Sequence, residues 1–330
     1  MGKTALVFGG GGSRGAYEMG VWQALNELGV EVDIVTGSSI GAVNAALFAQ
    51  GDFDIAMEVW RKMEESNVTE LTENEVFKDL LDKYIDEDKI RKSNIEFGVV
   101  TAELPSLKGH CVFANDIPKG EISDFIMASA ACFPFVQPHE IGDKKFVDGG
   151  FFDNLPVDMA AKKGARHVIA VDLDSYGFIR KESYDSLDSL KIISCQWELG
   201  NFFQFKPERI KREIRLGYLD TMKAFGAFSG NKYTFIKGEF AKKGLAEAEA
   251  AAEMFRCDPT ILYSKAMLDH RIKKAMEEEE EKSMAQGLVD EIRTKGRILL
   301  AGGPKKLLKE EKLAKKYLDK NIFLIENVVE

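Results

Sequence analysis

This chain has few of the residues on which disulfide-bonded and metal-binding folds depend. Its 330 residues include four cysteines and four histidines, and the cysteines are too far apart to form a Cys-x-x-Cys pair. This spacing excludes the common zinc and redox motifs and favours reduced thiols, as in a cytoplasmic protein. We therefore expect no metal site and no disulfide at the four cysteines, which are Cys111, Cys132, Cys195 and Cys257.

Long apolar runs and an excess of positive charge are also absent. No segment is apolar over the length of a transmembrane helix, and the N-terminus runs directly into an expected strand, which leaves no room for a signal peptide. The formal net charge of −9 argues against nucleic acid as a partner and gives no general attraction to anionic membranes. We expect a cytoplasmic protein whose contact with a membrane, if any, is peripheral.

What the chain does have is glycine at three informative turns, the first of which is Gly37-Ser38-Ser39-Ile40-Gly41. Residues 30–35 are rich in valine and isoleucine and residues 39–50 are rich in alanine, so the pattern predicts a strand, a sharp turn and a helix. A G-x-S-x-G sequence in this setting is typical of a nucleophile elbow, in which the glycines permit the turn and the serine stands exposed at the helix N-terminus. The helix dipole there favours developing negative charge, so Ser39 is the predicted nucleophile.

The second turn is the glycine-rich loop Gly10-Gly11-Gly12-Ser13-Arg14-Gly15. It follows a buried-strand pattern at residues 4–8 and precedes apolar residues at helical spacing over residues 15–28. Glycine N–H groups can closely approach the oxygen of a tetrahedral intermediate, and each preorganised donor can contribute about 3 kcal/mol. We therefore expect an oxyanion hole at Gly10, Gly11 and Gly12.

The third turn supplies a carboxylate. A short apolar stretch ends at Val147, and Asp148-Gly149-Gly150 follows at once. A free aspartate, whose pKa is about 3.9, is a weak base for a serine hydroxyl. The site must therefore raise the pKa of Asp148 by burial, or hold the carboxylate in direct hydrogen-bond contact with the nucleophile.

Together the three turns resemble the patatin-like phospholipases, lipid acyl hydrolases with a Ser/Asp dyad. The glycine loop matches the family pattern G-G-G-x-[RK]-G, with Gly9 where plant patatins tend to carry Asp, and Ser39 and Asp148 fall on the dyad. Residues 128–138 and 148–157 are also similar to the family, so the resemblance covers about residues 3–175.

This resemblance implies an ester hydrolase that acts on phospholipids, lysophospholipids or related acyl lipids through an acyl-enzyme intermediate, without a metal or an organic cofactor. It also implies that Arg14 ties the glycine loop in place and adds positive potential near the substrate phosphate. The remaining glycines of the three turns are the expected supporting residues: Gly15, Gly37, Gly41, Gly149 and Gly150.

Three alternatives stay open on the residues alone. The glycine loop by itself also fits a dinucleotide fingerprint, with Asp33 about twenty residues on as the ribose-binding acid. The order Ser, Asp, His is that of the α/β-hydrolases, which allows a triad with His270. That residue lies in a charged helical pattern, however, and we expect it to be a surface or structural histidine, like His110, His139 and His167. The third alternative is a lipid-binding or scaffold protein that keeps the fold without turnover.

Strand and helix patterns alternate up to about residue 174, which predicts an α/β fold. We expect a central, mostly parallel sheet flanked by helices, with the catalytic loops at its carboxyl edge. The expected patatin-like catalytic core spans residues 3–175. A mainly helical C-terminal extension, residues 176–330, would complete or cap the same domain.

Three segments of this extension carry further predictions. The aromatic cluster Trp197, Phe202, Phe203 and Phe205 fits a lid or an acyl pocket, or plain core packing. The five carboxylates at residues 277–281 fit a solvated helix face. Residues 304–320 form a basic amphipathic pattern that fits a helix resting on an anionic bilayer or docked on its own domain.

Overall fold

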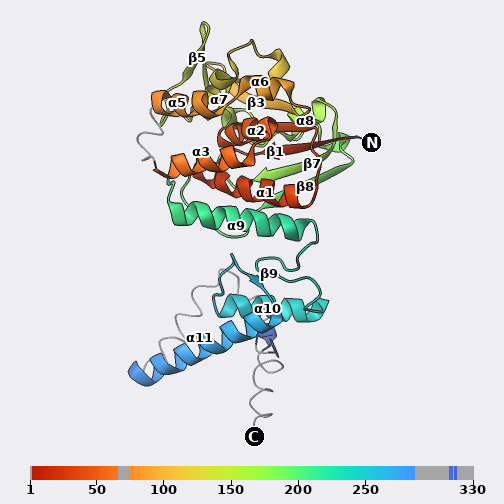
Figure 1. The fold of residues 1–330 in the computed structure, drawn as a ribbon, viewed down its shortest axis with the longest axis vertical. Helices are drawn as coiled ribbons and strands as arrows, with labels where there is room; N and C mark the ends of the chain where they lie inside the picture. Colours follow the sequence, from red (N-terminus) through yellow and green to blue (C-terminus); the bar gives the residue numbers. More distant parts are fainter. Residues whose placement is uncertain (1, 66–73, 287–311, 315, 318–330) are drawn as a thin grey trace. The chain divides into compact units, whose positions relative to one another are not determined.

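The computed structural model describes residues 2–65, 74–286, 312–314, 316 and 317. The chain divides into two compact units, Met1–Thr221 and Met222–Glu330 (Figure 1). The predicted boundary after residue 175 lies inside the first unit, because the residues that follow it add a strand and a helix to that unit. The division of the chain into a catalytic core and a C-terminal extension stays a prediction.

The first unit is built on an eight-stranded sheet in the order β5-β6-β3-β2-β1-β7-β8, with β4 paired to β3 beside this path. Five strands are mutually parallel: β1 (Lys3–Phe8), β2 (Ile34–Ser38), β3 (Glu96–Glu103), β7 (Ala165–Asp172) and β8 (Ser189–Ser194). The others run antiparallel to their neighbours: β4 (Lys108–Phe113), β5 (His139–Ile141) and β6 (Lys144–Asp148). The predicted mostly parallel sheet is confirmed.

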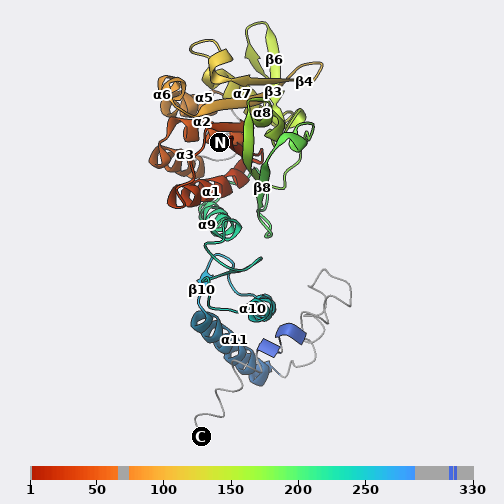
Figure 2. The ribbon, with the colours of Figure 1, turned by 90° about the vertical axis from the view of Figure 1, so that its right-hand side faces the viewer.

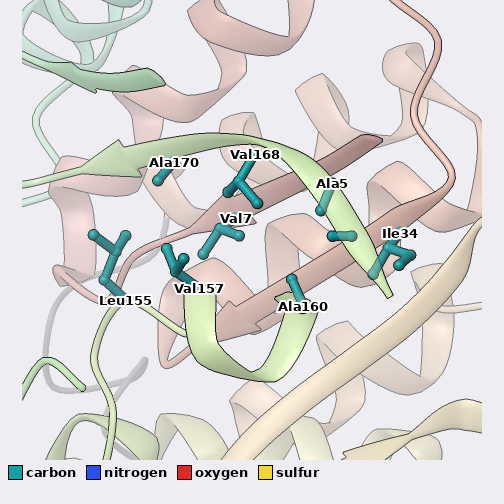
Figure 3. Close-up of a cluster of buried hydrophobic side chains, with 9 residues drawn as sticks. Ala5, Val7, Ile34, Leu155, Val157, Ala160, Val168 and Ala170 are labelled. Atoms are coloured by element: carbon teal, nitrogen blue, oxygen red, sulfur yellow. The ribbon is translucent and has the colours of Figure 1, made fainter. Parts of the chain in front are cut away.

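Helices cover both faces of this sheet. Because side chains alternate along a strand, Ala5 and Val7 of β1 face one side, where they pack with Val157 and Ala160 of α8 (Val157–Lys162) (Figure 3). On the other side, the Phe8 ring lies 6.1 Å from the ring of Phe48, which in turn lies 4.9 Å from that of Trp22. These last two rings belong to α2 (Ile40–Gln50) and α1 (Ala16–Glu27). The predicted α/β arrangement, with helices flanking the sheet, is confirmed.

The remaining helices of the first unit pack around these layers. Figures 1 and 2 both show α9 (Pro207–Ala224) beside α1, and the Tyr17 hydroxyl of α1 donates to Asp220 Oδ2 of α9 at 2.8 Å. The first unit also contains four further helices: α3 (Phe53–Glu65), α5 (Asn74–Tyr84), α6 (Glu87–Lys92) and α7 (Ile122–Ala130). Short 3-10 turns complete the unit: η1 (Gly12–Gly15), η2 (Ala114–Asp116), η3 (Gly149–Phe151) and η4 (Tyr184–Ser186).

The described part of the second unit is mainly helical, as predicted for the C-terminal extension. It holds α10 (Lys242–Met254), α11 (Lys265–Gln286) and a two-stranded parallel sheet of β9 (Thr234–Phe235) and β10 (Leu262–Tyr263). Glu277 and Glu278 on α11 are exposed, in keeping with a solvated face. No helix in the described part of the chain is both long and apolar enough to cross a bilayer.

Only part of the predicted basic helix at residues 304–320 lies within the described residues. There the Lys316 ammonium is 3.3 Å from the buried Glu247 carboxylate of α10, and Ala314 and Tyr317 are buried. The Tyr317 hydroxyl donates to Asp269 of α11. The described part of this segment therefore packs within its own unit, and its contact with a membrane stays a prediction.

Candidate active site

Ser39 occupies a strained turn between β2 and α2. Its φ of 55° is uncommon for a residue with a side chain, and such values concentrate at functional turns. The flanking glycines make the turn possible: a Cβ at Gly37 would lie 2.1 Å from the Gly41 carbonyl oxygen, and a Cβ at Gly41 would lie 2.5 Å from the Phe8 carbonyl oxygen. The strand, turn and helix predicted around Ser39 are therefore present, with the glycines required by close backbone contacts.

The sheet brings the end of β6 to this turn. β4 pairs along one edge of β3 from Gly98 to Glu103, so β2 and β6 share the other edge. β2 runs along that edge up to the pair Ser38 with Val100, and β6 runs toward it from the opposite direction, down to the pair Asp148 with Thr101. The C-terminal ends of the two strands therefore meet, and the serine and the aspartate stand at the meeting point.

The side chains of these two residues are in direct contact. Ser39 Oγ donates to Asp148 Oδ2 at 2.6 Å, and Asp148 Oδ1 accepts from the Gly150 N–H at 2.8 Å. The turn is held from α7, where Ser129 Oγ accepts the Ser39 N–H at 2.9 Å and donates to the Val100 carbonyl at 2.6 Å. Both oxygens of the carboxylate are thus engaged, and the serine hydroxyl points its proton at one of them.

Burial gives Asp148 the character of a base at neutral pH. The side chain is 6% exposed, and desolvation raises its pKa from 3.8 to about 6, although the hydrogen bonds from Ser39 and Gly150 oppose the rise. Above pH 6 the carboxylate is ionised and its affinity for a proton is well above that of a free aspartate. The sequence required a raised pKa or a direct contact with the serine, and the structure provides both.

The three glycines expected as oxyanion donors lie beside Ser39 and differ in what their N–H groups do. The Gly10 N–H donates to the Asn154 carbonyl at 3.0 Å, and the Asn154 side-chain amide donates back to the Gly10 carbonyl at 3.3 Å. Within the described residues, the N–H groups of Gly11 and Gly12 donate to no protein acceptor. Gly10 is therefore clamped by Asn154, and the free donors at this wall are those of Gly11 and Gly12.

Arg14 ties the glycine loop to two other segments. Its guanidinium donates to the carbonyls of Gly200 at 2.9 Å and Leu173 at 3.2 Å, and also to the Asp174 carbonyl. All three acceptors are backbone oxygens, so the arginine joins the loop to these two segments, and its role at the site stays a prediction. The other predicted supporting glycines stand at the same turns: Gly15 ends η1, and Gly149 and Gly150 begin η3.

A cavity of about 360 Å³ opens onto the dyad. Ser39 and Asp148 line it together with Gly10, Gly11, Gly12 and Gly150. Its other lining residues are mostly apolar or small: Cys132, Phe151, Asn154, Ser175, Tyr176, Gly177, Phe178 and Phe202. Burial raises the pKa of the Cys132 thiol to about 11, so this thiol stays protonated beside the serine. An apolar cavity with a few convergent polar groups is the form expected for a ligand-binding site.

Sequence reasoning missed several of these positions. Tyr176 and Phe178 lie in a loop with no regular pattern, and nothing in the sequence places that loop over the serine. Ser129 and Asn154 do lie in runs that resemble the family, so a finer reading of those runs could have found them. Of the predicted aromatic cluster, Phe202 lines the cavity and Phe203 stacks on it, whereas Phe205 packs on the buried core residue Trp60.

The three histidines of the first unit contact partners other than the dyad. None of them lines the cavity. His110 contacts Glu103 at 2.6 Å, and His139 contacts Asp124 at 3.0 Å. The third, His167, contacts Ser189 at 3.0 Å, and His270 lies on α11 of the second unit. Within the first unit, the described residues therefore offer no histidine as a third member of a triad.

The dinucleotide alternative fails on the position of Asp33. Its carboxylate accepts the Thr4 N–H at 2.7 Å, at the beginning of β1, whereas the glycine loop follows the end of that strand. At about 3.3 Å per residue, β1 separates the two by more than about 10 Å, so this acid cannot hold a ribose whose phosphates bind the loop.

Within the described residues, no three His, Cys, Asp or Glu side chains are placed to hold a metal ion.

Comparison with known proteins identifies the segment that carries this site. Residues 6–161 match the family model of the patatin-like phospholipases, and the match includes the glycine loop, Ser39 and Asp148. This segment is a patatin-like phospholipase domain. The resemblance expected from the three turns is therefore confirmed, over most of the range predicted for it.

Curated relatives of the patatin-like domain include lysophospholipases. Lysophospholipase NTE1 of Saccharomyces cerevisiae is 28% identical over 236 residues, which cover 66% of this chain and 14% of that protein. Lysophospholipase NTE1 of Candida albicans is 30% identical over 236 residues, covering 67% of this chain and 17% of that protein. The chain thus spans less than a fifth of the length of these relatives.

Two solved structures are also similar to this chain. VipD from Legionella pneumophila matches with a TM-score of 0.48 and 16% identity, over 89% of this chain and 78% of that one. The type III effector protein ExoU matches with a TM-score of 0.38 and 16% identity, over 68% of this chain and 53% of that one.

Proposed function

We propose that this protein is a serine acyl hydrolase that cleaves the ester bonds of phospholipids, lysophospholipids or related acyl lipids. The observation that carries the proposal is the 2.6 Å hydrogen bond from Ser39 Oγ to the buried Asp148 carboxylate, inside an apolar cavity with glycine amides on its wall. The relatives named lysophospholipase support the substrate class.

In the first half of the reaction, Ser39 Oγ attacks the ester carbonyl carbon while Asp148 Oδ2 takes the hydroxyl proton. The tetrahedral oxyanion accepts hydrogen bonds from the Gly11 and Gly12 N–H groups, each worth about 3 kcal/mol when preorganised. Collapse of this intermediate breaks the ester C–O bond, and Asp148 returns its proton to the leaving alkoxide. The product is an acyl chain esterified to Ser39.

Water completes the cycle by the same route. Asp148 removes a proton from a water molecule as its oxygen attacks the acyl carbonyl, and the second tetrahedral intermediate is held by the same amides. Release of the fatty acid returns the proton from Asp148 to Ser39 Oγ. One carboxylate therefore serves both steps, which suits a pKa of about 6 because the group must accept and release a proton near neutral pH.

Covalent labelling tests the nucleophile and the reaction class together. A fluorophosphonate probe should modify the full chain at one site, and peptide mapping should find the adduct on Ser39. The Ser39→Ala variant should neither be labelled nor hydrolyse a p-nitrophenyl ester, with a melting temperature within a few degrees of wild type. Labelling elsewhere, or turnover by Ser39→Ala, would refute the mechanism. A chain that binds lipid and is not labelled would be a lipid-binding protein of the same fold.

A further inference from the structure

Three runs of the chain border the cavity and contain no charged residue: residues 132–138, 175–179 and 201–205. Each contributes to the cavity lining, through Cys132, Tyr176 with Phe178, and Phe202. The first and third runs touch, because the Phe135 and Phe203 ring centroids are 4.6 Å apart and those of Phe202 and Phe203 are 4.3 Å apart. In a chain in which 30% of residues are charged, these runs form one uncharged border, which we call the aromatic rim.

The aromatic rim presents its rings to water. Phe133 is 49% exposed and Phe135 is 59% exposed, and in the run 175–179 Phe178 is 67% and Tyr176 is 92% exposed. Every other aromatic side chain in the described part of the chain is buried or half-buried. Exposed aromatic rings gathered around one cavity opening indicate a surface that contacts a partner or a membrane when the protein functions.

Hydrogen bonds from the backbone fix one run of the rim, residues 175–179, beside the cavity. The Phe178 N–H donates to the Gly150 carbonyl at 2.9 Å, and the Phe178 carbonyl accepts the Asn154 N–H at 2.6 Å. Next along this run, the Arg180 N–H donates to the Asp153 carboxylate at 3.2 Å. The backbone of this run is thus fastened to the segment that follows Asp148, while its Tyr176 and Phe178 rings line the cavity and are exposed to water.

We propose that the aromatic rim docks on the surface of a lipid aggregate, so that the cavity opens directly into the layer that supplies the substrate. This inference rests on the proposed function, because the acyl lipids it names reside in such aggregates. Aromatic rings partition into the interfacial region of a bilayer. An uncharged border on a chain of net charge −9 gains nothing from anionic lipid, so the partner is a zwitterionic surface such as phosphatidylcholine.

Vesicle flotation with matched variants tests the rim. The full chain carries Ser39→Ala, so that lipid is not consumed, and is floated with phosphatidylcholine vesicles. Phe135→Ser removes a rim ring that does not line the cavity, and Ile192→Ser is the control, a 51% exposed apolar side chain on β8. We expect Phe135→Ser to weaken partitioning about tenfold, which corresponds to about 1.4 kcal/mol, and Ile192→Ser to leave it unchanged.

A second variant covers the possibility that Phe135→Ser does not fold. Phe135→Trp keeps an aromatic ring, and its fluorescence should be quenched by vesicles of bromine-labelled phosphatidylcholine beyond any quenching of wild type. With Ser39 intact, Phe135→Ser should also hydrolyse a soluble p-nitrophenyl ester at the wild-type rate, because the cavity lining is untouched.

Several results would overturn the proposal. It fails if wild type does not float, if Phe135→Ser floats as well as wild type, or if Phe135→Trp is not quenched. It also fails if vesicle binding needs anionic lipid, or if Phe135→Ser abolishes a concentration-dependent dimer and leaves flotation intact, since the rim would then cover a second copy of the chain. Rim-dependent flotation without fluorophosphonate labelling of Ser39 would refute the proposed hydrolase and keep the rim.

Discussion

Replacing Asp148 with Asn should stabilise the fold at high pH while it abolishes hydrolysis. The pKa of Asp148 is about 6 in the folded chain and near 3.8 when the group is free, so the folded state binds this proton more tightly than the unfolded state. Stability from the protonated carboxyl is therefore fully present below about pH 4 and is lost as the pH rises through about 6. At about pH 8 the ionised carboxylate destabilises the folded state by about 3 kcal/mol.

The amide introduced by Asp148→Asn cannot ionise, so the stability of the variant lacks this pH dependence. The difference in free energy of unfolding between the variant and wild type should therefore grow by about 2 kcal/mol between about pH 4 and pH 8. This growth is smaller than the full effect because the unfolded aspartate is already partly ionised at about pH 4. Urea unfolding followed by tryptophan fluorescence measures this, because Trp22, Trp60 and Trp197 all lie in the first unit. A readout confined to one unit matters where two units can unfold separately.

The pH dependence of catalysis gives a second measure of the Asp148 pKa. For wild type, kcat/KM should fall about tenfold per pH unit below about pH 6 and level off above it, since only the ionised carboxylate accepts the Ser39 proton. Asp143→Asn, in the exposed turn between β5 and β6, is the matched control and should change neither the stability profile nor the rate profile. Parallel stability profiles for Asp148→Asn and wild type would refute the claim that burial raises this pKa.

Three further predictions address the rest of the site. Gly11→Val should lower kcat about 10²-fold, because a Cβ at Gly11 would lie 2.8 Å from Leu173 Cδ1 and must displace the Gly11 amide. A folded and fully active variant would show that Gly11 is not part of the oxyanion hole. Ser129→Ala should lower the rate of fluorophosphonate labelling about tenfold, because the Ser39 N–H loses its acceptor, whereas Ser129→Thr should restore part of it. Each single alanine variant of the four histidines should keep p-nitrophenyl ester turnover within about twofold of wild type. The four positions are His110, His139, His167 and His270. A folded variant that loses as much activity as Ser39→Ala would instead indicate a triad.

The sequence alone was sufficient for the local structure of the site. The run rich in valine and isoleucine, the glycines around Ser39 and the alanine-rich run predict strand, turn and helix, and a Cβ at Gly37 would lie 2.1 Å from the carbonyl oxygen of Gly41, four residues further on. Local sterics act over a few neighbouring residues and can therefore be inferred from the sequence. The same holds for the parallel sheet, whose buried strands carry the apolar residues that two helical layers require.

What only the tertiary structure decided is how distant segments meet. Asp148 reaches Ser39 because β4 occupies one edge of β3 and β6 is left to share the other with β2, and that pairing depends on residues about a hundred positions apart. The pKa of Asp148 follows from burial by the assembled unit, and the Gly10 amide is taken by Asn154, which no spacing reveals. The aromatic rim likewise exists only once three separate runs border one cavity, because solvent exposure and packing belong to the folded chain and not to its segments.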